Sequence, residues 1–330
     1  MSAAVPVPAP HPSPRRATLQ PELPAELIDL GDPVTSRPSD PAVHQLRAGL
    51  DTRLRALLTR DPGTRVGRDP EELHQMRVAV RRMRAALKAA RPLLDRSWAD
   101  DLRAELGWLG RALGPVRDAD VLIERLRGRA AAFDDVGRDA AESLLEALVA
   151  EREIARAEML AVLSSERYTA LLVRLAKAVS TPLPTGRGKS AGPALVELVR
   201  REFRRLDKAV SGIGDDPPDE VLHALRIKGK RLRYTAELAA TSGGKPVRKL
   251  VESTVALQDV LGEHQDACVA QQRVTALLNG LGDVVDLDVV FVAGRLVERE
   301  EVSRIATRET WSAAWQQVAL RAEALDSLTG

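Results

Sequence analysis

The stretch Leu73–Leu94, LHQMRVAVRRMRAALKAARPLL, carries two stripes of opposite chemistry at one helical period. Its apolar side chains recur every three or four residues and share one face, as in a helix packed on a core. An adjacent face is basic, and no acid lies between His74 and Arg91 to neutralise it. Solvated helix faces usually mix opposite charges at this spacing, so the row favours an extended anionic ligand. This first basic stripe consists of His74, Arg77, Arg81, Arg84 and Lys88.

The same pattern returns at Leu222–Tyr234, LHALRIKGKRLRY, again without a carboxylate. A constant offset that aligns Leu73 with Leu222 also aligns the histidine and three of the cations of the two stretches. This repetition indicates an internal duplication. The second basic stripe consists of His223, Arg226, Lys230 and Arg233, and further candidates beside the stripes or on the preceding helices are Arg55, Arg204, Arg82, Lys228 and Arg231.

The composition favours an all-α fold. Of the 330 residues 44% are hydrophobic and only 3% aromatic, which suits helices packed through aliphatic side chains. Half of the 20 prolines precede residue 42, and this density predicts a disordered lead-in. We therefore expect a lead-in at 1–39, a first helical bundle at 40–180, a basic Pro/Gly linker at 181–192 and a second helical bundle at 193–330.

Cysteine usage and hydropathy limit the class of protein. Cys268 is the only cysteine, which excludes an intramolecular disulfide and a multi-thiolate metal cluster within one chain. No apolar segment follows Arg15 and Arg16 as in a secretory leader, and no apolar run of membrane-spanning length occurs in the sequence. We expect a cytoplasmic protein with no membrane partner, no metal site and no cofactor.

Each basic stretch is followed by a glycine with an aspartate four residues later. The pairs are Gly114 with Asp118 in LGPVRDADV, and Gly262 with Asp266 in LGEHQDACV. A glycine at this place is typical of a helix C-cap, and the aspartate then suits the start of the next helix. We interpret both motifs as breaks between helices.

These residues resemble the CHAD family, the conserved histidine α-helical domain. The resemblance rests on HQMRVAVRRMR and HALRIKGKRLRY, each followed by the glycine and aspartate motif, and it covers about residues 40–327. It implies two four-helix bundles related by a pseudo-twofold axis, with basic side chains around a central groove or pore. In the family that groove binds inorganic polyphosphate, and members associate with polyphosphate granules.

The resemblance also implies the ligand contacts, which would be the nine residues of the two basic stripes. Binding without catalysis is expected, because no nucleophile elbow, phosphate loop or dinucleotide fingerprint is present. A divalent cation can arrive with the polyphosphate. The roles of His74 and His223 stay open between structural hydrogen bonding and pH-dependent phosphate contact.

Two other functions remain to be separated from polyphosphate binding. A nucleic-acid-binding protein would also bind phosphate groups. Tyr234 is the only aromatic residue in either basic stretch, so stacking of bases on aromatic side chains is disfavoured. An adaptor or accessory subunit of a phosphohydrolase is the second alternative. The sequence leaves assembly into a homo-oligomer open.

Overall fold

The computed structural model describes residues 27, 30–181, 193–214, 216–281 and 286–325. Every regular element in these ranges is helical, which confirms the all-α prediction. Of the predicted linker at 181–192 only Thr181 is described, and residues 182–192, most of the predicted lead-in and the end of the chain from 326 lie outside the described residues. None of the described helices combines the length and the apolar character that crossing a membrane requires.

The helices follow one another with short connections. In chain order they are α2 (Ala42–Val66), α3 (Pro70–Ala89), the 3-10 helix η1 (Arg91–Leu93), α4 (Arg96–Ala130), α5 (Asp135–Leu163), α6 (Glu166–Ser180), α7 (Pro193–Val210), α8 (Asp219–Asn279) and α9 (Leu287–Glu323).

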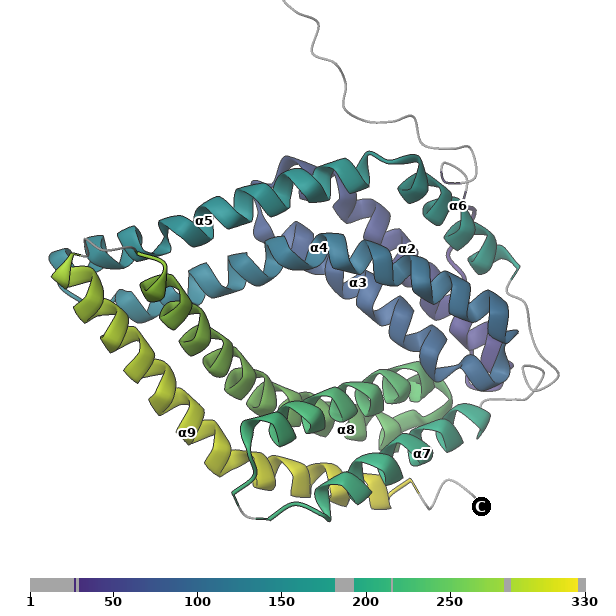
Figure 1. The fold of residues 1–330 in the computed structure, drawn as a ribbon. Helices are drawn as coiled ribbons and strands as arrows, with labels where there is room; N and C mark the ends of the chain where they lie inside the picture. The colour runs from purple at the N-terminus through teal and green to yellow at the C-terminus, as the bar shows by residue number, and fades with distance from the viewer. Residues whose placement is uncertain (1–26, 28–29, 182–192, 215, 282–285, 326–330) are drawn as a thin grey trace, which may run out of the picture.

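Helix α8 is two helices in one. Gly244 has φ +60°, a left-handed conformation that glycine adopts without a Cβ clash. The chain reverses there, so residues 219–243 and 245–279 run back along each other (Figure 1). The element order from α7 onwards thereby parallels that from α2 onwards. The duplication behind this parallel remains a prediction from the sequence.

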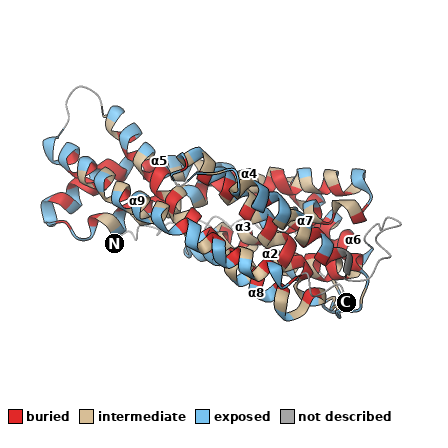
Figure 2. Cartoon of the chain, turned by 90° about the horizontal axis from the view of Figure 1, so that it is seen from below, coloured by how far each residue is buried: buried red, intermediate tan, exposed pale blue. Residues whose placement is uncertain are grey.

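The helices form two groups that lie opposite each other (Figure 1). One group contains α2 to α6, and the other contains α7 to α9. The two groups meet at one end, where α5 packs on α9, and again where α3 packs on α8. The buried residues lie between neighbouring helices and the exposed residues on the outer faces (Figure 2).

Two hydrophobic cores hold this arrangement together. The larger core draws on both groups and includes Leu46, Met83, Leu232 and Trp315. The smaller core joins the far ends of α4, α5, α8 and α9. Burial of such side chains contributes roughly 1.5–3 kcal/mol each, so each core fixes how its helices face one another.

Part of the predicted lead-in packs on α2. Leu27 is buried in the larger core, and Arg55 donates to the carbonyl oxygens of Leu30 and Gly31 at 3.2 and 2.8 Å. The backbone N–H of Val34 donates to Asp51 at 3.0 Å. The ordered contacts of the chain therefore begin before α2.

The predicted break at Gly114 is wrong. Helix α4 continues through Gly114 and Pro115 to Ala130, and Gly114 does not have the positive φ of a C-cap. A proline inside a helix costs about 3 kcal/mol. Leu113 and Val116 are both buried beside it, and their packing holds the helix on each side. The predicted break at Gly262 is wrong for the same reason, since α8 continues to Asn279.

Candidate functional site

The orientation of the first basic stripe is fixed by its apolar neighbour. Asp69 caps α3 by accepting the backbone N–H of Glu71 at 2.8 Å, and Pro70 occupies the first turn. Met76 and Met83 are fully buried in the larger core. Because the two stripes are adjacent on the helix, burying one aims the other away from that core. Arg81, Arg84 and Lys88 are accordingly exposed.

The second basic stripe lies on the first segment of α8. Leu222, Leu225 and Leu232 are buried on one face. Gly229 is also buried, and a Cβ there would come within 3.9 Å of Gln258 on the returning segment. The close packing of the two segments turns the cations of the first segment outward, as in α3.

The two stripes approach each other. Burial, followed by repulsion from Arg226, Arg81 and Arg77, lowers the pKa of Lys230 to about 8. Two of these arginines belong to α3, although Lys230 and Arg226 belong to α8. The packing of α3 on α8 therefore brings cations from the two groups of helices within electrostatic reach.

The other end of the stripes is also basic. Burial lowers the pKa of Lys88, and repulsion from Arg231 and Arg103 lowers it further. Arg231 of α8 is thus close enough to act electrostatically on the stripe of α3. Lys228 is partly buried beside it on α8.

The glycine and aspartate motif positions an arginine. A Cβ at Gly114 would lie 2.8 Å from Nη1 of Arg77, so the missing side chain makes room for the guanidinium. One turn further along α4, Asp118 accepts from Arg77 at 2.9 Å. Asp118 is therefore an ion-pair partner and not the helix cap that the sequence predicted.

The second copy of the motif repeats this arrangement more loosely. Nε of Arg226 would lie 3.9 Å from a Cβ at Gly262, and Nη2 of Arg226 lies 3.9 Å from Asp266. Burial raises the pKa of Asp266, although Arg226 opposes this shift. Both motifs thus place a carboxylate against the same position of a basic stripe.

The end of the second stripe is neutralised. Arg233 donates to Glu237 at 2.8 Å, and Arg82 of α3 lies 3.4 Å from the same carboxylate. Arg77, Arg226 and Arg233 therefore have carboxylate neighbours that the stripes themselves lack. Among the residues described, no carboxylate lies within ion-pair distance of Arg81, Arg84, Lys88 or Lys230.

The two histidines differ. Burial, then repulsion from Arg117, lowers the pKa of His74, so this ring resists protonation in the free chain. Nδ1 of His223 forms a hydrogen bond with Oε1 of Gln265 on the returning segment of α8, while the side chain stays exposed. His223 thus has a structural partner and remains accessible from solvent.

Two of the further candidates are held outside the stripes. Arg55 is paired with Asp51 at 3.0 Å and binds backbone oxygens before α2. Arg204 on α7 donates to Glu197 at 2.9 Å. These contacts give both residues a structural role.

Arg117 is a cation that the sequence reasoning missed. It lies on α4, acts electrostatically on both His74 and Arg77, and its Nε is buried with no hydrogen-bond partner in the described part of the chain. Nε of Arg226 is likewise buried with no hydrogen-bond partner in the described part of the chain. The predicted break at Gly114 hid this residue, because Arg117 shares a helix with Gly114 only when α4 continues through Pro115.

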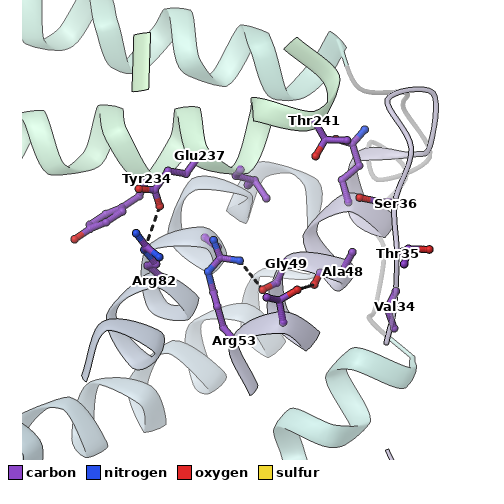
Figure 3. A pocket seen from close by; sticks show the side chains of 14 residues that line it. Val34, Thr35, Ser36, Ala48, Gly49, Arg53, Arg82, Tyr234, Glu237 and Thr241 are labelled. Carbon is purple, nitrogen blue, oxygen red and sulfur yellow. Dashed lines mark hydrogen bonds and ion pairs between the residues drawn. The ribbon is translucent and has the colours of Figure 1, made fainter. Parts of the chain in front are cut away.

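A pocket of about 350 Å³ lies next to the stripes, between α2, α3 and the first segment of α8. Figure 3 shows Arg82 joined to Glu237 at its wall, and Arg53 bonded to the backbone oxygen of Gly49. Tyr234 also lines it. Its wall thus combines cations with a carboxylate.

Comparison with known proteins agrees with this architecture. The chain is 32% identical over 275 residues to two uncharacterized proteins of Mycobacterium tuberculosis, MT2285 of strain CDC 1551 and Rv2226 of strain H37Rv. The match covers 81% of this chain and 50% of each relative. The chain therefore spans about half the length of these curated relatives.

Two solved structures share the fold. PptA from Streptomyces chartreusis aligns with a TM-score of 0.67 at 22% identity, covering 84% of this chain and all of that one. The CHAD domain from the plant Ricinus communis aligns with a TM-score of 0.63 at 26% identity, covering 86% of this chain and 94% of that one. Residues 48–275 match the CHAD domain family. With this match over more than half of its length, the chain belongs to the CHAD domain family.

Proposed function

We propose that this chain binds inorganic polyphosphate between the basic stripes of α3 and α8. The observation that carries the proposal is the approach of the two stripes: burial, then repulsion from Arg226 on α8 and from Arg81 and Arg77 on α3, lowers the pKa of Lys230 to about 8. Holding like charges together costs free energy, and a bound anion offsets that cost.

The chemistry of the stripes suits a linear phosphate polymer. Guanidinium groups bind phosphate oxygens in pairs of parallel hydrogen bonds, and the unpartnered Nε donors of Arg117 and Arg226 add unused capacity. A chain of phosphates can contact cations along several turns of both helices. Aromatic platforms for bases are scarce here, since Tyr234 is the only aromatic residue in the two basic stretches.

We further propose binding without catalysis. The carboxylates that contact the stripes, Asp118, Glu237 and Asp266, each lie against an arginine. This arrangement suits charge compensation in the empty site better than activation of water. We propose that the protein binds polyphosphate in the cytoplasm and that this binding directs it to polyphosphate granules.

Titration with polyphosphates of increasing length tests the proposal. We expect affinity to rise with chain length until the stripes are filled, and to fall steeply with salt because counterions are released on binding. The double variant R81E/K230E should abolish binding and leave helicity intact. R174E/K177E is the matched control, because it changes net charge equally on exposed positions of α6, away from α8 in Figure 1.

The outcomes separate the alternatives. Equal competition by DNA or RNA at matched phosphate concentration would favour a general nucleic-acid binder. Release of phosphate from polyphosphate, with or without Mg²⁺, would identify an enzyme or part of one. Unchanged polyphosphate affinity in R81E/K230E would overturn the assignment of the site.

A further inference from the structure

A cluster of three potential metal ligands lies at the start of α8. Asp219 is the first residue of that helix, and His264 and Cys268 lie one turn apart on its returning segment. His264 Nε2 is 3.2 Å from Asp219 Oδ1. Cys268 Sγ is 3.7 Å from Asp219 Oδ2 and 3.9 Å from His264 Nδ1. One ligand atom from each residue falls within 4.8 Å of the others.

His264 is the residue that ordinary packing leaves unexplained. Its side chain is only 2% exposed, yet Nε2 has no hydrogen-bond partner within the described ranges. The nearby Asp219 oxygen lies within ion-pair distance of Nε2 at 3.2 Å without forming a well-defined hydrogen bond to it. A buried polar nitrogen without such a bond is unfavourable, and a metal ion would satisfy it.

We propose that Asp219, His264 and Cys268 bind a divalent cation of the zinc class. In tetrahedral zinc sites the bonds to sulfur, nitrogen and oxygen are about 2.3, 2.0 and 2.0 Å, which separates neighbouring ligand atoms by about 3.3–3.5 Å. The separations of 3.2 Å between His264 Nε2 and Asp219 Oδ1 and of 3.7 Å between Cys268 Sγ and Asp219 Oδ2 lie within about 0.2 Å of this range. Three protein ligands leave the fourth position to water.

The surrounding charges permit a cation. Arg304 donates to Asp219 at 3.0 Å and Arg308 also binds this carboxylate, but each arginine has a second acid of its own. Arg304 pairs with Glu301 at 2.6 Å, and Arg308 pairs with Asp216. The Asp219 carboxylate and a Cys268 thiolate therefore remain to balance the two positive charges of the ion.

The donor set selects the class of metal. One thiolate and one imidazole suit zinc and its softer neighbours, whereas magnesium and calcium prefer sites made of oxygen ligands. Metal binding would release the thiol proton of Cys268 to solvent and take the imidazole of His264 in its neutral form, as ligation requires.

The location suggests what the ion would do. It would join the first turn of α8 to the returning segment, one turn before His223 at the start of the second basic stripe. This cross-link would hold the end of that stripe in place. The metal site stands independently of polyphosphate binding, since its three ligands are not stripe residues.

Cobalt substitution gives a direct test with the full chain. Cys268 is the only cysteine, so a thiolate-to-Co²⁺ charge-transfer band can arise only from this residue. We expect the band to saturate at one Co²⁺ per chain and Zn²⁺ to displace the Co²⁺. C268A should lose the band completely, and H264Q and D219N should weaken Co²⁺ binding at least tenfold.

H44Q is the matched control for imidazole removal, because His44 lies on α2 and binds the carbonyl oxygen of Thr35. It should keep the band. C268A removes only one sulfur atom and is the smaller change. It therefore still tests the proposal if H264Q fails to fold. A folded wild-type chain with neither a charge-transfer band nor stoichiometric Zn²⁺ binding would overturn the proposal.

Discussion

Arg77 of α3 donates to Asp118 of α4 at 2.9 Å, directly above the position where Gly114 has no side chain. The two residues are 41 positions apart in the chain. Asp118 is 70% exposed, so this ion pair lies within reach of solvent. In the proposed function Asp118 is the internal competitor of the polyphosphate for Arg77.

Removing that competitor should strengthen binding. We expect D118N to raise polyphosphate affinity about two- to fivefold, the range that corresponds to one exposed ion pair. Isothermal titration at fixed salt measures it. D101N, an equal charge change at an exposed position of α4, should have a smaller effect. Weaker binding in D118N would mean that Asp118 orients Arg77 and does not compete for it.

Filling the space at Gly114 should displace Arg77. A Cβ there meets the end of a flexible side chain, so G114A should cost little stability while lowering polyphosphate affinity several-fold. G128A on the same helix meets nothing within 4 Å and should only add up to about 1 kcal/mol of stability through helix propensity. Equal affinities of the two variants would argue against a role for the glycine in the site.

The charge of Lys230 should make binding depend on pH. Its pKa of about 8 in the free chain means that the ammonium is lost as pH rises from about 7 to 9, well below the ordinary range for lysine. Polyphosphate affinity should therefore fall over this interval. K230R keeps the charge and should flatten the profile. An unchanged slope in K230R would assign the pH dependence to another group.

The buried charge of Lys230 should also lower the stability of the fold. A lysine whose pKa is lower in the folded than in the unfolded chain destabilises the fold at low pH, and this cost is relieved as pH rises through about 8 and above. K230M should thus raise the melting temperature at pH 7 while weakening polyphosphate binding. Thermal unfolding followed by circular dichroism at pH 7 and pH 10 checks both the sign and the window. A lower melting temperature in K230M would contradict it.

Glu300 should stabilise the packing of α9 on α4. It is fully buried and accepts from Arg125 and Arg129 at 2.9 Å each, which ties α9 to α4. E300A would remove one carboxylate from the partly buried Arg125 and Arg129, which keep Glu263 as a partner, at a cost of about 1.5–3 kcal/mol. E298A, exposed two residues earlier, should stay within about 0.5 kcal/mol of the wild type. Denaturant unfolding of the two variants compares them directly.

The sequence by itself determined the helices and the two basic stripes, because both depend on a local period that the backbone imposes. Met76 and Met83 are buried where the period places them, and Arg81 and Arg84 are exposed. The family followed from the same residues. Side-chain direction relative to the helix axis is set within a few turns, so no knowledge of the partners was needed.

Only the tertiary structure decided what the stripes face. The pairing of Arg77 with Asp118, the continuity of α4 through Pro115 and the approach of Lys230 to Arg81 all depend on how helices distant in the chain pack together. A glycine followed by an aspartate is compatible with a helix cap and also with a helix that leaves space for an arginine side chain. Helix propensity cannot decide between them, because it is weaker than the free energy of burying apolar side chains. The packing of the apolar helix faces determined that the helix continues.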